Sequence, residues 1–182
     1  MRLWTFQAKQ SIEELLKEGI LTAKWERYNS PTWKRAYEWM RDQMEMKSID
    51  CKGNAPIWAW HSCGGVYGKS PTLEDASNLL SLLEIESGVQ TIEFECPDEF
   101  ALLSSYGAWN NEVLDYFIIG VKEVILPTQK LKELFEVSPQ NLHESDSIQA
   151  TLPFLLKEWV VDIRPLKLKA DVDFEFDEGE LV

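Results

Sequence analysis

The pattern of hydrophobic and polar positions changes from strand-like to helix-like within the first twenty residues. The segment 3–6, Leu-Trp-Thr-Phe, consists of aromatic, bulky and β-branched residues, which are typical of a strand. Apolar residues then recur at the spacing of one helix face. Ser11 and Glu14 form a capping-box pattern, and Gly19 is of the type that commonly ends a helix. The opening therefore predicts an interior strand over 3–6 and a helix over 11–18.

Similar patterns along the rest of the chain predict short strands interspersed with helices. Strands are predicted over 57–61, 89–96, 148–153 and 159–168, the last broken at Pro165. Helices are predicted over 31–46, 70–82, 106–117 and 127–137. Because no internal repeat or linker divides the chain, residues 1–170 are expected to form a single compact α+β domain. Its mixed, mostly antiparallel sheet is expected to contain about five or six short strands, with about four or five helices packed around it.

Acidic residues are concentrated at the C-terminal end, where six of them fall in the twelve residues 171–182. Acidic and apolar positions alternate there, which is compatible with an edge strand or with a solvated end. We expect the solvated end, because chain termini fray unless they are tied down. This acidic tail is therefore expected to contribute little to folding.

The whole chain is also acidic, with 31 Asp and Glu against 18 Lys and Arg and a formal net charge of −13. Nucleic-acid affinity rests largely on Lys and Arg side chains that neutralise phosphates, so direct nucleic-acid binding is not expected. The acidic excess could engage a basic protein partner by long-range steering, or it could serve solubility alone. The sequence leaves the oligomeric state open.

Cysteine content and hydropathy bear on the cellular compartment. Cys51, Cys63 and Cys96 are odd in number and far apart, which is typical neither of a disulfide framework nor of a cysteine-rich zinc site. No apolar signal core follows Met1, and the sequence has no run of about 18 apolar residues. These features predict a soluble, cytoplasmic protein without a membrane segment or a metal site.

Four short motifs, in this order along the chain, resemble a known family. They are Leu-Trp-Thr-Phe-Gln at 3–7, Pro-Ile-Trp-Ala-Trp at 56–60, Ile-Glu-Phe-Glu-Cys-Pro-Asp at 92–98 and Ile-Gln-Ala-Thr at 148–151. Together they resemble an uncharacterised family of small bacterial proteins that begin Leu-Trp-Thr-hydrophobic-Gln. The resemblance implies a cytoplasmic bacterial protein in which this architecture is a whole domain, and it carries no activity.

A second resemblance concerns mono-ADP-ribosyltransferase-like domains. A first strand with a small polar residue, followed by a helix that ends in Gly-hydrophobic, is similar to the start of these domains, and Gln149 to Thr151 is similar to their catalytic strand. The resemblance implies a cleft for NAD. However, Thr5 stands where the family has His or Arg, and Thr151 stands where it has the catalytic Glu. A hydroxyl cannot supply the missing charge, so transferase activity should be weak or absent unless Glu144 or Glu158 takes that role.

Aromatic and polar side chains in three predicted strands are candidates for a ligand site. Trp58 and Trp60 share one strand face and could form a platform for a nicotinamide or adenine ring, or they could belong to the core. Thr5 and Gln149 are polar residues within apolar strands, where a buried polar group needs a partner. That partner could be a ligand in a cleft, the backbone, or each other. If the three strands are neighbours, these four residues are expected to frame one pocket with Thr151 at its rim.

Two functions from different classes follow from the sequence. The leading hypothesis is a small-molecule cleft of ADP-ribosyltransferase-like shape for a nucleotide or NAD-like ligand, with degenerate or weak transferase activity. The alternative is an acidic protein-binding or inhibitor module that mimics a polyanion and engages a basic, nucleic-acid-handling partner without catalysis. A concave pocket lined by Trp4, Thr5, Trp58, Trp60 and Gln149 would favour the cleft, whereas a large contiguous acidic face without such a pocket would favour the module.

Overall fold

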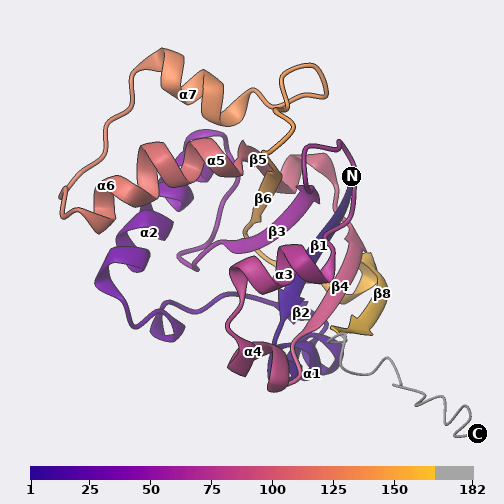
Figure 1. Cartoon of the computed structure of the whole chain (residues 1–182). Helices are drawn as coiled ribbons and strands as arrows, with labels where there is room; N and C mark the ends of the chain where they lie inside the picture. Colours follow the sequence, from indigo (N-terminus) through magenta and orange to yellow (C-terminus); the bar gives the residue numbers. More distant parts are fainter. Residues whose placement is uncertain (167–182) are drawn as a thin grey trace, which may run out of the picture.

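A six-stranded antiparallel sheet organises residues 1–166, the part of the chain that the computed structural model describes (Figure 1). Its strand order is β5-β6-β3-β1-β4-β8. The strands are β1 (Arg2–Gln7), β3 (Ile57–Ser62), β4 (Gln90–Glu95), β5 (Leu102–Ser105), β6 (Ile148–Leu152) and β8 (Val160–Pro165). A separate ladder pairs β2 (Ile20–Leu21) with β7 (Leu155–Leu156). The predicted acidic tail, 171–182, lies outside the described residues.

Helices of different lengths surround the sheet and confirm the prediction of a single α+β domain (Figure 1). They are α1 (Lys9–Glu18), α2 (Pro31–Met46), α3 (Leu73–Leu79), α4 (Leu82–Glu86), α5 (Tyr106–Trp109), α6 (Asp115–Ile118) and α7 (Thr128–Phe135). A π-helical turn, Asn110–Leu114, joins α5 to α6. Within residues 1–166, no helix is both long enough and apolar enough to span a membrane.

The opening strand and helix form as predicted, although the helix begins earlier. Ala8 is the N-cap of α1, so Ser11 lies inside the helix and the predicted capping box was wrong. The Ser11 hydroxyl instead accepts a hydrogen bond from Arg27 Nη1 at 3.1 Å. The predicted stop is confirmed, because Gly19 has φ 80° and its N–H donates to the Leu15 carbonyl. Only glycine adopts this left-handed conformation without strain.

Two capping boxes divide the segment for which one helix was predicted. Thr72 and Asp75 cap α3, and Ser81 and Glu84 cap α4. Leu80, between the two helices, has an extended backbone. The helix predicted over 70–82 is therefore shorter, Leu73–Leu79, and a second helix that was not predicted begins at Leu82, because Ser81 caps a new helix N-terminus.

One face of the sheet packs against α1. Leu3 of β1 and Ile92 of β4 are fully buried, and Ile12 and Leu15 of α1 belong to the same core cluster. Leu155 extends this cluster into the β2–β7 ladder. The apolar stripe of α1 therefore covers the centre of the sheet, as expected for an amphipathic helix.

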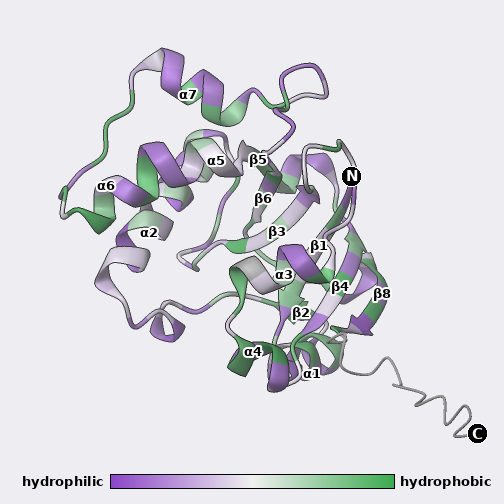
Figure 2. Ribbon diagram, in the orientation of Figure 1, coloured by the Kyte–Doolittle hydropathy of each residue, from purple (hydrophilic) through white to green (hydrophobic). Residues whose placement is uncertain are grey.

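The opposite face of β3, β5 and β6 is covered by α2, α7 and the segment from α5 to α6. Met40 and Met44 of α2, Val113 of the π-helical turn and Leu134 of α7 are fully buried in this second core cluster. Figure 2 shows hydrophilic and hydrophobic bands on the helices, as expected for elements with one buried face. Trp58 of β3 packs against this cluster.

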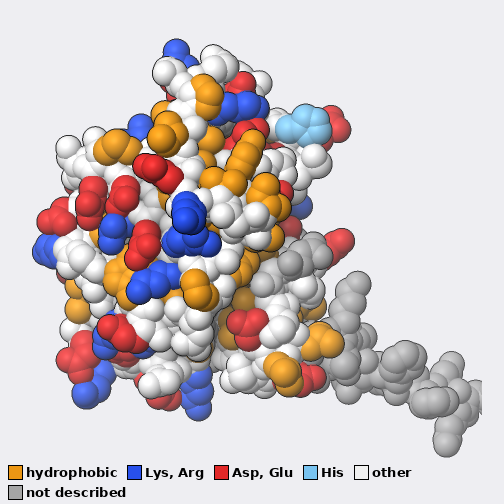
Figure 3. Space-filling model, turned by 90° about the vertical axis from the view of Figure 1, so that its left-hand side faces the viewer, with side chains coloured by type: hydrophobic (Ala, Val, Ile, Leu, Met, Phe, Trp, Pro, Cys, Tyr) orange, Lys and Arg blue, Asp and Glu red, His pale blue; other side chains and the backbone are white. Residues whose placement is uncertain are grey.

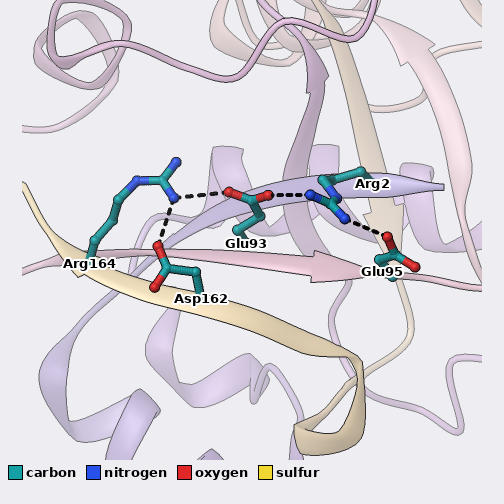
Figure 4. A network of polar contacts seen from close by, with 5 residues as sticks. All are labelled: Arg2, Glu93, Glu95, Asp162 and Arg164. Carbon is teal, nitrogen blue, oxygen red and sulfur yellow. Dashed lines mark hydrogen bonds and ion pairs between the residues drawn. The ribbon is translucent and has the colours of Figure 1, made fainter.

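On that same face, β1, β4 and β8 carry a network of ion pairs (Figure 4). The Glu93 carboxylate accepts hydrogen bonds from Arg2 Nη1 and Arg164 Nη1, both at 2.9 Å. Arg2 also donates to Glu95, and Arg164 also donates to Asp162. The network links three neighbouring strands, of which β8 ends at Pro165, where a break was predicted. Residues 167–168 of the predicted strand lie outside the described residues.

Candidate functional site

The two central strands, β1 and β3, share a single register pair, Trp4 with Trp60. By contrast, every residue of β1 from Arg2 to Gln7 pairs with β4. Beyond Trp4, the side chain of Thr5 replaces the main-chain ladder and donates from Oγ1 to the Trp58 carbonyl at 2.7 Å. Fewer register pairs therefore join β1 to β3 than join any other two neighbouring strands of the sheet.

A cavity of about 480 Å³ lies where these two strands meet. Its walls come from the end of β1, the first turn of α1, the start of α2, strand β3 and the segment Tyr106–Asn110. Small-molecule sites typically enclose roughly 300–1,000 Å³. The cavity, called the aromatic cavity below, is therefore large enough for a nucleotide-sized ligand.

Aromatic rings form most of the apolar wall of the aromatic cavity. The rings are those of Phe6, Tyr28, Trp33, Tyr37, Trp58, Trp60, Tyr106 and Trp109. The Trp58 ring lies 4.9 Å from Tyr37 and 5.0 Å from Trp109, measured between ring centroids, and Trp60 lies 5.1 Å from Tyr106. Burial raises the pKa values of Tyr28 and Tyr37, so both phenols stay uncharged near neutral pH. The arrangement favours a planar ring as ligand.

Gln149 of β6 lines the aromatic cavity beside Trp60, its register partner in β3. The side chain is 3% exposed, and its amide nitrogen has no hydrogen-bond partner among the described residues. The indole nitrogen of Trp58 is also buried without a partner there. Buried polar groups are nearly always hydrogen-bonded in native proteins, so these two unpartnered nitrogens are unusual among the residues that line the aromatic cavity.

The structure places Trp4, Thr5 and Thr151, which were expected in or beside the pocket, outside the lining of the aromatic cavity. Side chains alternate along a strand, and Trp4 is the register partner of Trp60, so Thr5 points to the other face of the sheet. Its hydroxyl is held by the Trp58 carbonyl. Thr151 is fully buried, and its Oγ1 donates to the Leu102 carbonyl at 3.4 Å. Both hydroxyls are therefore committed to the backbone.

The candidate carboxylates Glu144 and Glu158 are exposed and also lie outside the lining. Glu144 belongs to the turn before β6, and Glu158 lies in the 3-10 turn Lys157–Trp159. Among the described residues that line the aromatic cavity, Glu84 is the only carboxylate, and it accepts hydrogen bonds from the Ser81 main chain and hydroxyl. The structure therefore does not place Glu144 or Glu158 beside Trp58, Trp60 and Gln149.

Arg27 is the only cationic side chain among the described lining residues. Its Nη1 donates to Ser11, and its Nη2 donates to Glu14 Oε2 at 3.0 Å. Within residues 1–166 there is no group of three or more His, Cys, Asp or Glu side chains that could hold a metal ion. The lining is thus suited to binding a ring and has few groups for acid or base chemistry.

Several lining residues were missed by sequence reasoning. They are Arg27, Tyr28, Trp33, Tyr37, Tyr106, Trp109 and Asn110. Trp33 and Tyr37 are one helical turn apart near the start of α2, and this spacing was a signal of a shared face. Asn110 begins the π-helical turn, a distortion frequently found at functional sites, which the sequence pattern does not reveal.

The fold and the aromatic cavity together define a class, an α+β domain with a ring-lined cavity between two central strands. Residues 2–123 match the family described as a domain of unknown function, DUF3841, and the chain belongs to this family. No curated protein and no solved structure matches the chain. The matched segment includes β1, α1, α2 and β3, whereas Gln149 lies beyond it.

Proposed function

We propose that this domain binds a small molecule with a planar ring, a nucleotide or an NAD-like compound, in the aromatic cavity. The observation that carries the proposal is the unpartnered amide nitrogen of Gln149 in a ring-lined cavity of about 480 Å³. A base or nicotinamide ring can stack on Trp60 or Tyr106 and present an acceptor to Gln149. Stacking of a base on an aromatic side chain contributes about 1–3 kcal/mol.

We further propose that the domain has weak or no transferase activity. β6, β3 and β1 are neighbours in the sheet, and the resemblance to mono-ADP-ribosyltransferase-like domains implies such a neighbourhood. Thr5 and Thr151 replace the charged residues of those domains, and both are bonded to main-chain carbonyls. Hydroxyls held in this way cannot stabilise a developing positive charge. Binding without efficient turnover is therefore the expected behaviour.

The alternative function is an acidic module for a basic protein partner. The surface charges on the face of the molecule that carries α2 and α6 give it less support. Figure 3 shows acidic and basic side chains interspersed on that face. A polyanion mimic needs a surface dominated by one sign of charge. The ring-lined cavity, by contrast, is the feature that was expected to favour small-molecule binding.

Titration of the purified full chain with NAD tests the proposal, with tryptophan emission and calorimetry as readouts. We expect quenching with one ligand bound per chain, and a loss of about 1–3 kcal/mol of binding free energy in Trp60→Ala. Trp159→Ala is the matched control, because Trp159 packs against Phe100 and Phe154 outside the cavity lining. Absence of both heat and quenching with NAD, AMP and nicotinamide would end the proposal.

A further inference from the structure

The N-terminus of α1 opens onto the aromatic cavity. Ala8, the N-cap, and Ser11 both line the cavity. Ala8 has no side chain that can accept a hydrogen bond, and no acidic residue lies in the first turn of this ten-residue helix. The first N–H groups of a helix find no partner inside it, and the helix dipole places partial positive charge there. This end of α1 is thus electropositive and lacks the side-chain cap that usually compensates it.

Arg27 adds a full positive charge beside the same helix end. It lines the aromatic cavity and donates from Nη1 to the buried hydroxyl of Ser11 in the first turn. A guanidinium has five donor hydrogens, and the contacts to Ser11 and Glu14 each engage one nitrogen. Donors therefore remain for an anionic group in the cavity.

A second polar feature, Gln149, lies at a different part of the same cavity. Gln149 is two strands away from β1 through Trp60, and Ala8 is four residues beyond Trp4 along the chain. Strand spacing and rise per residue separate the two features by about 10 Å across the sheet and about 13 Å along it. A single base or nicotinamide ring cannot span both. A ligand that contacts both must carry a ring and an extended anionic group.

We infer that the aromatic cavity takes a nucleoside phosphate, with its ring stacked on Trp60 and in contact with Gln149, and its phosphate at the N-terminus of α1 beside Arg27. Arginine and helix N-termini are both suited to phosphate oxygens. This inference rests on the proposed function and adds to it that the phosphate, and not the ring alone, is recognised. The unpartnered amide of Gln149 identifies the cavity as a ligand site independently of the helix end.

Glu14 competes with the phosphate for Arg27. Its carboxylate accepts from Arg27 Nη2 at 3.0 Å and lies 3.6 Å from Lys24 Nζ. Loss of the Glu14 charge should therefore leave Arg27 free for a ligand, whereas loss of the Arg27 charge should remove the attraction. The two substitutions break the same ion pair but have opposite effects on an anionic ligand, which separates charge recognition from damage to the fold.

The experiment compares nicotinamide mononucleotide with nicotinamide riboside, which has the same ring and ribose but no phosphate. Each is titrated into the full chain while calorimetry and tryptophan emission are recorded. We expect the mononucleotide to bind at least about tenfold more tightly, as one charge-assisted contact implies. Arg27→Gln should abolish the difference, and Glu14→Gln should retain or increase it. Arg164→Gln, the same substitution in the ion-pair network, should change neither affinity.

Three results would overturn the inference. Equal affinities for the two compounds in the unaltered chain would remove the phosphate site but leave ring binding, and thus the proposed function, intact. An equal loss of affinity for both compounds in Arg27→Gln would show that Arg27 acts only through the fold. Failure of both compounds to bind the unaltered chain would defeat the inference together with the proposed function.

Discussion

Gln149 and Ser104 face each other as register partners in β6 and β5, and each has a buried polar atom without a partner among the described residues. Gln149 lines the aromatic cavity, whereas Ser104 lies outside its lining. The same sheet face thus holds two side chains with an unsatisfied polar atom, of which only Gln149 belongs to the cavity lining. A substitution of Ser104 can therefore serve as the control for a substitution of Gln149, because both remove an unpartnered buried polar atom and only Gln149 lines the cavity.

We expect Gln149→Met to keep or raise the stability of the ligand-free chain and to weaken ligand binding. An unpartnered buried polar group costs about 1–3 kcal/mol, so an apolar side chain of similar volume removes that cost. Ser104→Ala should also keep or raise stability but leave ligand affinity unchanged. Denaturant unfolding and NAD titration of both variants provide the measurements, and equal binding losses in the two would contradict the assignment.

Gly19→Ala should destabilise the chain by about 1 kcal/mol. Gly19 has φ 80°, and a Cβ atom there would meet no other atom within 4 Å, so the cost comes from backbone conformation and not from a clash. Glu18→Ala, one residue earlier at the end of α1, should have a smaller effect. Thermal unfolding checks both variants, and an unchanged melting temperature for Gly19→Ala would speak against the left-handed helix end.

Stability should fall in acid partly through Glu93. Hydrogen bonds from Arg164 and Arg2 hold the pKa of Glu93 below its ordinary value of 4.5. A carboxyl whose pKa is lowered by folding stabilises the protein above its unfolded pKa, and this contribution disappears as the pH falls through the folded pKa. We expect Glu93→Gln to lower the melting temperature at pH 7 and to reduce its further decline below about pH 4.5.

Glu95→Gln is the comparison for Glu93. Among the described residues, Glu95 pairs with Arg2 alone, and its side chain is 63% exposed, against 16% for Glu93. Exposed ion pairs contribute little to stability because water and salt screen them. A larger loss of stability in Glu95→Gln than in Glu93→Gln would show that the network in Figure 4 does not centre on Glu93.

The sequence predicted those parts of the fold that depend on the backbone conformation of a single residue or on the alternation of side chains within one strand. Gly19 was recognised because a left-handed helix end favours glycine wherever it occurs, and the strand alternation placed Trp58 and Trp60 on one face. The start of α1 was missed because β1 ends at Gln7 and the helix follows immediately, which leaves Ser11 inside it. A capping pattern gives no information on where the preceding strand stops pairing, and in this chain that position determines where α1 begins.

The composition of the aromatic cavity was only partly predictable, for a different reason. Trp58, Trp60 and Gln149 lie in strands whose adjacency a resemblance implied, and their role in ligand binding stays a prediction. Arg27, Tyr28 and the other walls come from α2, the segment before it and the segment after β5. Their positions depend on how helices pack on the sheet, and periodicity within one segment does not specify that packing.

The single register pair between β1 and β3 has a mechanical consequence. The sheet consists of two three-stranded halves, β5-β6-β3 and β1-β4-β8, and the strand ladder at the seam between them has only the pair Trp4 with Trp60, beside the hydrogen bond from Thr5 to Trp58. The aromatic cavity is lined from both sides of this seam, by Phe6 of β1 and by Trp60 of β3. A molecule bound there would bridge the two halves, and we expect its release to loosen the middle of the sheet while each half stays intact.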